Sequence, residues 1–266
     1  MTDIQRMLCY KAWLETRSRF FTALVATVAV CAFWTLGHTW IDNQWQRDLI
    51  EHPEWKNPAW FLRAMDDYPF YLHHFVYAEM LQKIWVIFAV LLGIGGLTRE
   101  AAQGTAGFTL SLPVSRLSVF RAHAVLALVE LFALCLAAPL LIVVLSRVMH
   151  LDYPLGHGLS HSALIFFGGI VFLAASLCVT QFVEGEHTPA LIGLGGVGLL
   201  YFVMQPYVDG LPVSGLAVPF ALPKLMAGNP DIRGVADIDW WGMTASLMAA
   251  TGFFALAVRR NQRHDY

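Results

Sequence analysis

Glu130 is the residue of this 266-residue chain whose position most clearly invites a chemical role. It is the one acid well inside a long apolar run, 122–145. If that run crosses a bilayer, a position about eight or nine residues from its end lies near the midplane, at about 1.5 Å per residue. An ionisable side chain there is costly and is a candidate for contacting a substrate or lining a path. The alternative is a structural carboxyl, hydrogen-bonded to a neighbouring helix.

Histidines form a second group of candidate ligands. His157 and His161 are four residues apart, a spacing that can chelate a metal ion if the segment is helical. Their segment, YPLGHGLSH, is rich in glycine and contains a proline, and no third ligand is evident, so we predict no metal site. Further histidines are expected on the same side of a membrane: His73, His74 and His150. The cysteines match no zinc-ligand spacing and are expected to be buried, inert thiols: Cys9, Cys31, Cys135 and Cys178.

The composition defines the elements that must position these groups. Of the residues, 57% are hydrophobic and 14% charged, and the mean hydropathy is +0.57. A helix needs roughly 20 mostly apolar residues to cross a bilayer. We therefore predict an all-α membrane protein with a single domain, 1–266, and six transmembrane helices. The predicted spans are about 20–40, 76–97, 122–145, 163–183, 190–207 and 240–258.

The distribution of basic residues predicts the orientation. With six spans both termini lie on one side, and ten of the 17 Lys and Arg residues fall on that side, in short segments. The positive-inside rule then places both termini in the cytoplasm, in a multi-pass protein of the plasma membrane, here the bacterial inner membrane. The formal net charge is −2 and the basic residues form no stripe, so we expect no nucleic-acid partner.

The connection between the second and third spans, 98–121, carries the most specific motif. It reads REAAQGTAGFTLSLPVSR from Arg99 to Arg116. Pro113 disfavours helix at the preceding residue, and Ser115 can cap the helix that leads into the third span. The pattern resembles the cytoplasmic coupling helix of permease subunits of ABC-2-type ATP-binding-cassette transporters. The matching residues are Glu100, Gly104, Thr105, Leu112, Pro113, Val114, Ser115 and Arg116; Ala106 and Gly107 depart from the acidic residue often found there.

Two further segments resemble the same family. The N-terminal segment MLCYKAWLETRSRF, within 1–19, is similar to its amphipathic elbow helix, with Lys11, Glu15 and Arg19 at i, i+4 and i+8. Such a helix suits the membrane interface. Residues 210–228, interrupted by three prolines, resemble its re-entrant external helices before the last span. An ordinary basic flank and an interfacial loop are the respective alternatives.

The resemblance implies a transmembrane permease subunit that is not itself an enzyme. No Walker A motif occurs, and GLGGVG at 193–198 lies within an apolar span, where a dinucleotide loop cannot form. Family members pair with a second permease copy or paralogue and with separate soluble ATPase subunits, which bind ATP and Mg; export is the expected direction. This chain would need no cofactor of its own. The alternative is a membrane-embedded, metal-dependent enzyme or binding protein that uses Glu130 and the external histidines.

Overall fold

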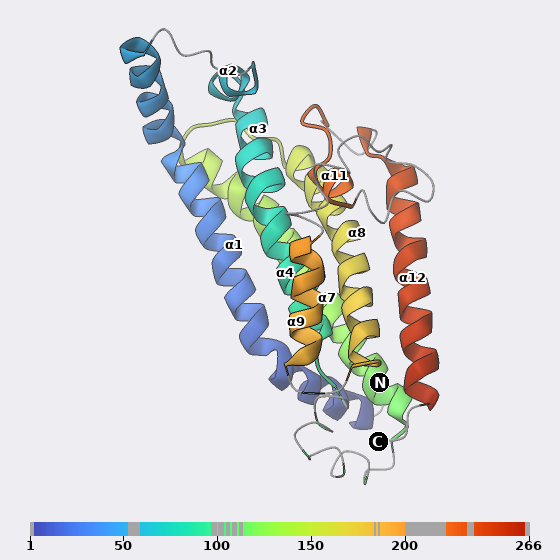
Figure 1. Ribbon diagram of the computed structural model, residues 1–266. Helices are drawn as coiled ribbons and strands as arrows, with labels where there is room; N and C mark the ends of the chain where they lie inside the picture. The colour runs from blue at the N-terminus through green and yellow to red at the C-terminus, as the bar shows by residue number, and fades with distance from the viewer. Residues whose placement is uncertain are drawn as a thin grey trace.

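The computed structural model describes residues 3–52, 59–96, 100, 104, 107, 111, 114–183, 185, 187–199, 222–232 and 237–263. Within these residues every regular element is a helix (Figure 1). The elements are α1 (Asp3–Glu51), α2 (Ala59–Asp66), α3 (Tyr68–Tyr71), the π-helix η1 (Leu72–Leu81), α4 (Gln82–Gly93), α7 (Arg116–Val148), α8 (Leu155–Thr180), α9 (Thr188–Gly198), α11 (Leu222–Ala227) and α12 (Trp240–Arg263).

Five helical segments in the described part of the chain are long and apolar enough to cross a membrane: Ile4–Glu51, Tyr68–Gly93, Arg116–Val148, Leu155–Thr180 and Trp240–Gln262. They indicate a multi-pass membrane protein and correspond to five of the six predicted spans. Most of these helices are longer than the predicted windows, because a hydropathy window finds only the part that suits hydrocarbon. Polar residues continue the helices beyond it.

The first helix shows this extension most clearly. Residues 42–51, expected in an external loop, belong to α1. Hydrogen bonds one turn apart join Gln46 to Asp42 and Gln44 to Asp48, both at 3.2 Å, and such pairs favour helix at an exposed end. The 49 residues of α1 would extend over about 70 Å if straight, more than a bilayer with its headgroups.

The sixth predicted span, 190–207, begins in α9, but residues 200–221 lie outside those described, so this crossing stays a prediction. The predicted re-entrant segment, 210–228, is described only from Leu222. There α11 packs at the end of the bundle away from both termini (Figure 1), where Gln82 Nε2 donates to the carbonyl of Pro223 at 2.7 Å. The end that carries both termini is called the terminal end below.

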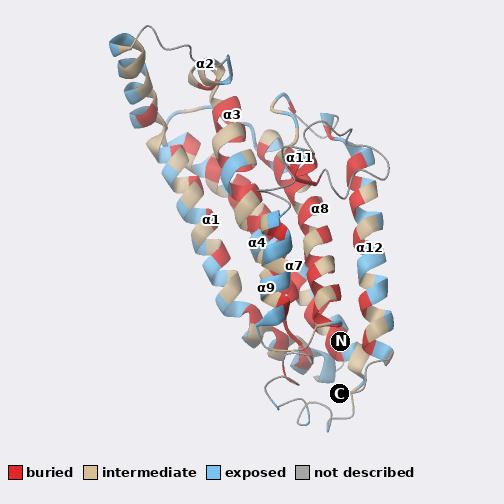
Figure 2. Cartoon of the chain, viewed as in Figure 1, coloured by how far each residue is buried: buried red, intermediate tan, exposed pale blue. Residues whose placement is uncertain are grey.

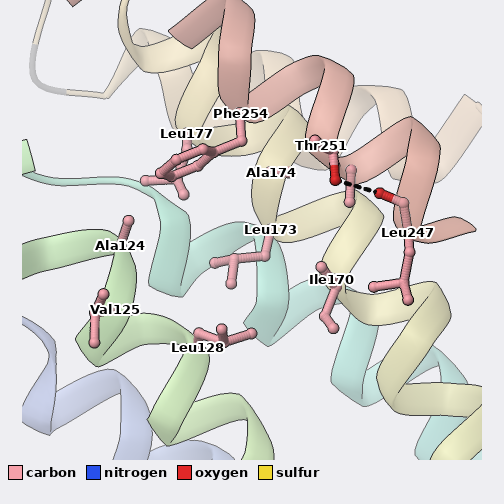
Figure 3. A pocket seen from close by; sticks show the side chains of 11 residues that line it. Ala124, Val125, Leu128, Ile170, Leu173, Ala174, Leu177, Leu247, Thr251 and Phe254 are labelled. Carbon is pink, nitrogen blue, oxygen red and sulfur yellow. Dashed lines mark hydrogen bonds between the residues drawn. The ribbon is translucent and has the colours of Figure 1, made fainter. Parts of the chain in front are cut away.

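Helix α8 is the centre of the bundle, in contact with α4, α7, α11 and α12. Small residues let the backbones approach: a Cβ atom at Gly93 would lie 2.9 Å from the carbonyl oxygen of Leu173. The Ser176 hydroxyl donates across the same contact to the carbonyl of Val90 at 2.7 Å. Figure 2 shows buried residues concentrated on α8 and exposed ones along α1 and α12. An apolar groove lies between α7, α8 and α12 (Figure 3).

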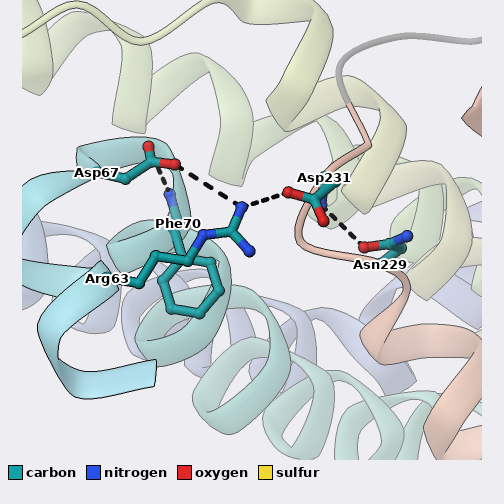
Figure 4. Close-up of polar contacts among 5 residues, drawn as sticks. All are labelled: Arg63, Asp67, Phe70, Asn229 and Asp231. Carbon is teal, nitrogen blue, oxygen red and sulfur yellow. Dashed lines mark hydrogen bonds and ion pairs between the residues drawn. The ribbon is translucent and has the colours of Figure 1, made fainter. Parts of the chain in front are cut away.

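At the end of the bundle opposite the terminal end, Arg63 joins α2 to the segment after α11 (Figure 4). Its guanidinium forms an ion pair with Asp231, lies 4.0 Å from Asp67, and sits 4.4 Å above the ring of Phe70. The hydrogen bond to Asp231 raises the pKa of Arg63. We call these three residues and Phe70 the Arg63 clamp; it holds together segments that are distant in sequence.

We predict a measurable coupling between Arg63 and Asp231. A double-mutant cycle of Arg63→Ala and Asp231→Ala should give a small favourable coupling energy, because the pair is exposed and screened by solvent. Hydrogen exchange of the α2 amides is the measurement. Glu79→Ala with Lys83→Ala removes a pair of similar exposure within one helical segment and should leave α2 unchanged. A coupling energy near zero would show that the Arg63–Asp231 pair does not stabilise the contact between α2 and the segment after α11.

Candidate functional site: the junction of the N-terminal helix with α4 and α7

The candidate site lies at the terminal end, where the first turns of α1 run across the bundle before the helix turns along it (Figure 1). The three residues predicted from their helical spacing each have a partner there. Lys11 Nζ lies 2.5 Å from Glu100 Oε1. Glu15 Oε2 accepts from the backbone N–H of Gly96 at 3.3 Å. Arg19 donates to the carbonyl of Leu91 at 2.5 Å and also to that of Ile94.

The end of α4 explains why a cation lies at position 19. The helix ends at Gly93, and Ile94 is extended, with φ −88° and ψ 120°. The last carbonyls of a helix have no partners within it and attract positive charge. The Arg19 guanidinium satisfies two carbonyls at this end, so α1 is anchored to the point where α4 enters the connection.

Glu100 lies at the start of that connection and is buried, with 8% of its surface exposed. Its partner Lys11 is about one-third exposed at the side chain. A carboxylate removed from water needs a cation close by, since a buried, unpaired charge is strongly destabilising. Glu100, predicted to be part of a coupling surface, is therefore tied to α1 instead of extending from a free loop.

Glu130 is bound to the same N-terminal segment. Its side chain is 3% exposed, and the hydroxyl of Thr16 donates to its Oε1 at 2.5 Å. Thr16 is fully buried and also approaches the carbonyl of Ala12 at 3.2 Å. Two interpretations of Glu130 were considered, a structural carboxyl and a contact to a substrate. The hydrogen bond to Thr16 agrees with the structural carboxyl. A role in contacting a substrate stays a prediction.

The described residues of the predicted coupling motif are few. Ser115 caps α7, as predicted, because its side chain accepts from the N–H of Ser118 at 3.2 Å. Arg116 is the first residue of α7. Gly104 has φ +72°, a left-handed conformation that favours glycine, and no atom lies within 4 Å of a Cβ placed there. Thr105, Leu112 and Pro113 lie outside the described residues.

Sequence analysis missed two buried residues of this junction, Thr16 and His123. The His123 side chain is 3% exposed and lies against the backbone of Gly95, where a Cβ would come within 2.6 Å of its ring. Nearby, Asn261 of α12 donates to Gln181 at the end of α8 at 2.9 Å. His123 could have been noticed as a polar residue in an apolar run, two positions after Arg121. Nothing in the sequence points to Thr16 except that it lies in the segment that resembles an elbow helix.

Of the histidines expected on the external side, His157 and His161 are helical, contrary to the interpretation of their glycine-rich segment, whereas His150 lies in a turn with φ 57°. His157 and His161 both lie in α8, and the His161 ring is 4.7 Å from that of His73 in η1. His73 Nε2 lies 2.8 Å from the carbonyl oxygen of Ala227. His74 instead stacks on Trp60 at 4.7 Å. In the part of the chain that the structure describes, no three His, Cys, Asp or Glu residues are grouped so that they could hold a metal ion.

A polar cluster surrounds the His73 and His161 pair. The Tyr77 ring lies 5.3 Å from that of His161, and a Cβ at Gly158 would be 3.0 Å from the Tyr77 hydroxyl. Burial raises the pKa of the Tyr153 phenol, which lies between α7 and α8 and stays neutral. The cluster is buried, and it joins η1 to α8.

Comparison with known proteins adds no assignment. No protein-family model matches the chain, and no curated protein sequence or solved structure is significantly similar to it.

Proposed function

We propose that this chain is the transmembrane permease subunit of an ATP-binding-cassette transporter of the ABC-2 type. It would work with a second permease copy or paralogue and with separate ATPase subunits that bind ATP and Mg. The ATPases supply the chemistry, and this chain supplies the path and passes their motion to it. Export is the direction implied by the resemblance.

The observation that carries the proposal is the set of ties at the junction. If a soluble partner displaces the connection between α4 and α7, that displacement moves the membrane-spanning helices only when the connection is bonded to them. Lys11 pairs with Glu100, Glu15 accepts from Gly96, and Arg19 holds the end of α4. Coupling between distant sites travels through such contiguous contacts.

Glu130 extends these ties to a third helix. Through Thr16 it joins α7 to the same turns of α1 that hold Glu100 and α4. A displacement of the connection would thus reach α1, α4 and α7 together. The hydrogen bond is buried, where it is more directional and stronger than in water. In this proposal Glu130 is a positioning residue, with any contact to a substrate left to a different conformation.

We predict that the tagged full-length chain, solubilised gently from its native membrane, copurifies with a Walker-motif ATPase in near-stoichiometric amount. As a control, residues 101–113 are replaced by a Gly-Ser linker of equal length, which should remove the ATPase while size and helix content persist. Recovery of the intact chain without any such ATPase would contradict the proposal.

We further predict that Lys11→Glu uncouples ATP hydrolysis from the ATP-dependent movement of the transmembrane helices in the copurified complex. Residues along a coupling network modulate coupling by about 0.5–2 kcal/mol, which is roughly twofold to thirtyfold. Spin labels at exposed Val25 of α1 and Leu256 of α12, with Cys9 replaced, report the ATP-dependent distance change. Hydrolysis should continue while that change is reduced.

The charge-swapped pair Lys11→Glu with Glu100→Lys should restore the distance change, because the ion pair is re-formed with reversed sign. Arg17→Glu alters an exposed residue of the same helix and serves as the matched control. A normal distance change in Lys11→Glu would exclude the ion pair from coupling. Failure of the swap alone would show that the sign of the charge at position 100 matters to another partner.

A further inference from the structure

The groove between α7, α8 and α12 is apolar and has a volume of about 270 Å³ (Figure 3). It exists because α7 and α12 meet near the terminal end, where the rings of Phe120 and Phe254 are 5.5 Å apart, and then diverge across α8 (Figure 1). Small side chains from all three helices leave the space open, among them Ala124, Ala174 and Ala250.

The lining of the groove is apolar. Thr251 is the one lining residue with a polar side chain, and its hydroxyl already donates to the carbonyl of Leu247 at 2.7 Å, as Figure 3 shows. Water therefore finds no polar partners there. An empty groove would also forfeit the dispersion contacts of its lining atoms. Within a bilayer, the available apolar molecule is a lipid chain.

Charge at the rim indicates the headgroup. Arg121 of α7 is exposed and precedes the lining residues Val125 and Leu128 by four and seven positions, so the three share one helical face. Arg121 lies toward the terminal end of the groove, where a guanidinium can bind a phosphate through paired hydrogen bonds.

We propose that this groove binds one acyl chain of an anionic phospholipid whose phosphate is held by Arg121. The apolar lining suits an acyl chain, and the charge of Arg121 suits the phosphate of its headgroup. The site requires only that the chain spans a membrane and is independent of the transporter proposal. The bound lipid would bridge α7 and α12 where they no longer touch each other.

Native mass spectrometry of the delipidated full-length chain tests the site. Phosphatidylglycerol and phosphatidylcholine with identical acyl chains are titrated separately. Thr251→Phe places a ring in the groove at an exposed lining position and should weaken phosphatidylglycerol binding about tenfold, the loss expected when roughly two CH₂ groups are excluded. Arg121→Gln should abolish the preference for phosphatidylglycerol over phosphatidylcholine.

Two variants are matched controls. Ala255→Phe adds the same ring on the exposed face of α12 outside the groove, and Arg147→Gln removes the same charge at the opposite end of α7. Both should bind as the unaltered chain does, with far-UV circular dichroism confirming folding of all four variants. Equal phosphatidylglycerol binding by Thr251→Phe and Ala255→Phe would overturn the proposal. A change in oligomeric mass of Thr251→Phe without a change in lipid binding would also overturn it, in favour of a second protein chain.

Discussion

The bonds between Arg19 and the carbonyls at the end of α4 are the interaction on which the terminal end depends. A transmembrane helix must satisfy its own backbone, and its last carbonyls are the groups that it cannot satisfy. Where α4 ends at Gly93, the carbonyls of Leu91 and Ile94 accept hydrogen bonds from Arg19, which precedes them by more than 70 residues. This one contact sets where α1 crosses the bundle. Glu15 and Lys11, one and two turns earlier, then reach Gly96 and Glu100.

The close approach of α4 and α8 is the second constraint, and it lies at the same end of α4 as the first. Gly93 is both the last residue of α4 and the point where that helix touches Leu173 and Ser176. A larger residue there would separate the helices and move the carbonyls that Arg19 binds. Gly93 therefore affects both the packing of α4 against α8 and the hydrogen bonds between Arg19 and the end of α4. At the opposite end, Arg63 and Asp231 join α2 to the segment after α11 through an exposed ion pair.

The sequence allowed the membrane-spanning character, five of the six spans and the Ser115 cap to be predicted, because each depends on residues close together in the chain. The ends of the helices were missed, since the polar pairs that extend α1 beyond residue 41 do not register as hydropathy. The helix at His157 was also misjudged. Pro154 stands before the first turn, where its missing N–H costs nothing, and Gly158 admits the Tyr77 hydroxyl.

The pairing of Lys11 with Glu100 and of Thr16 with Glu130 could not be predicted, because each joins segments far apart in sequence and depends on the direction in which α1 turns. These pairings also change the interpretation of Glu130. A lone carboxyl in an apolar run indicates a site by its cost alone. A carboxyl that accepts from a buried threonine on the segment that also holds Glu100 has that cost partly offset, and it joins α7 to that segment. The acid then matters to the junction because breaking its bond would remove a buried polar contact between α7 and α1.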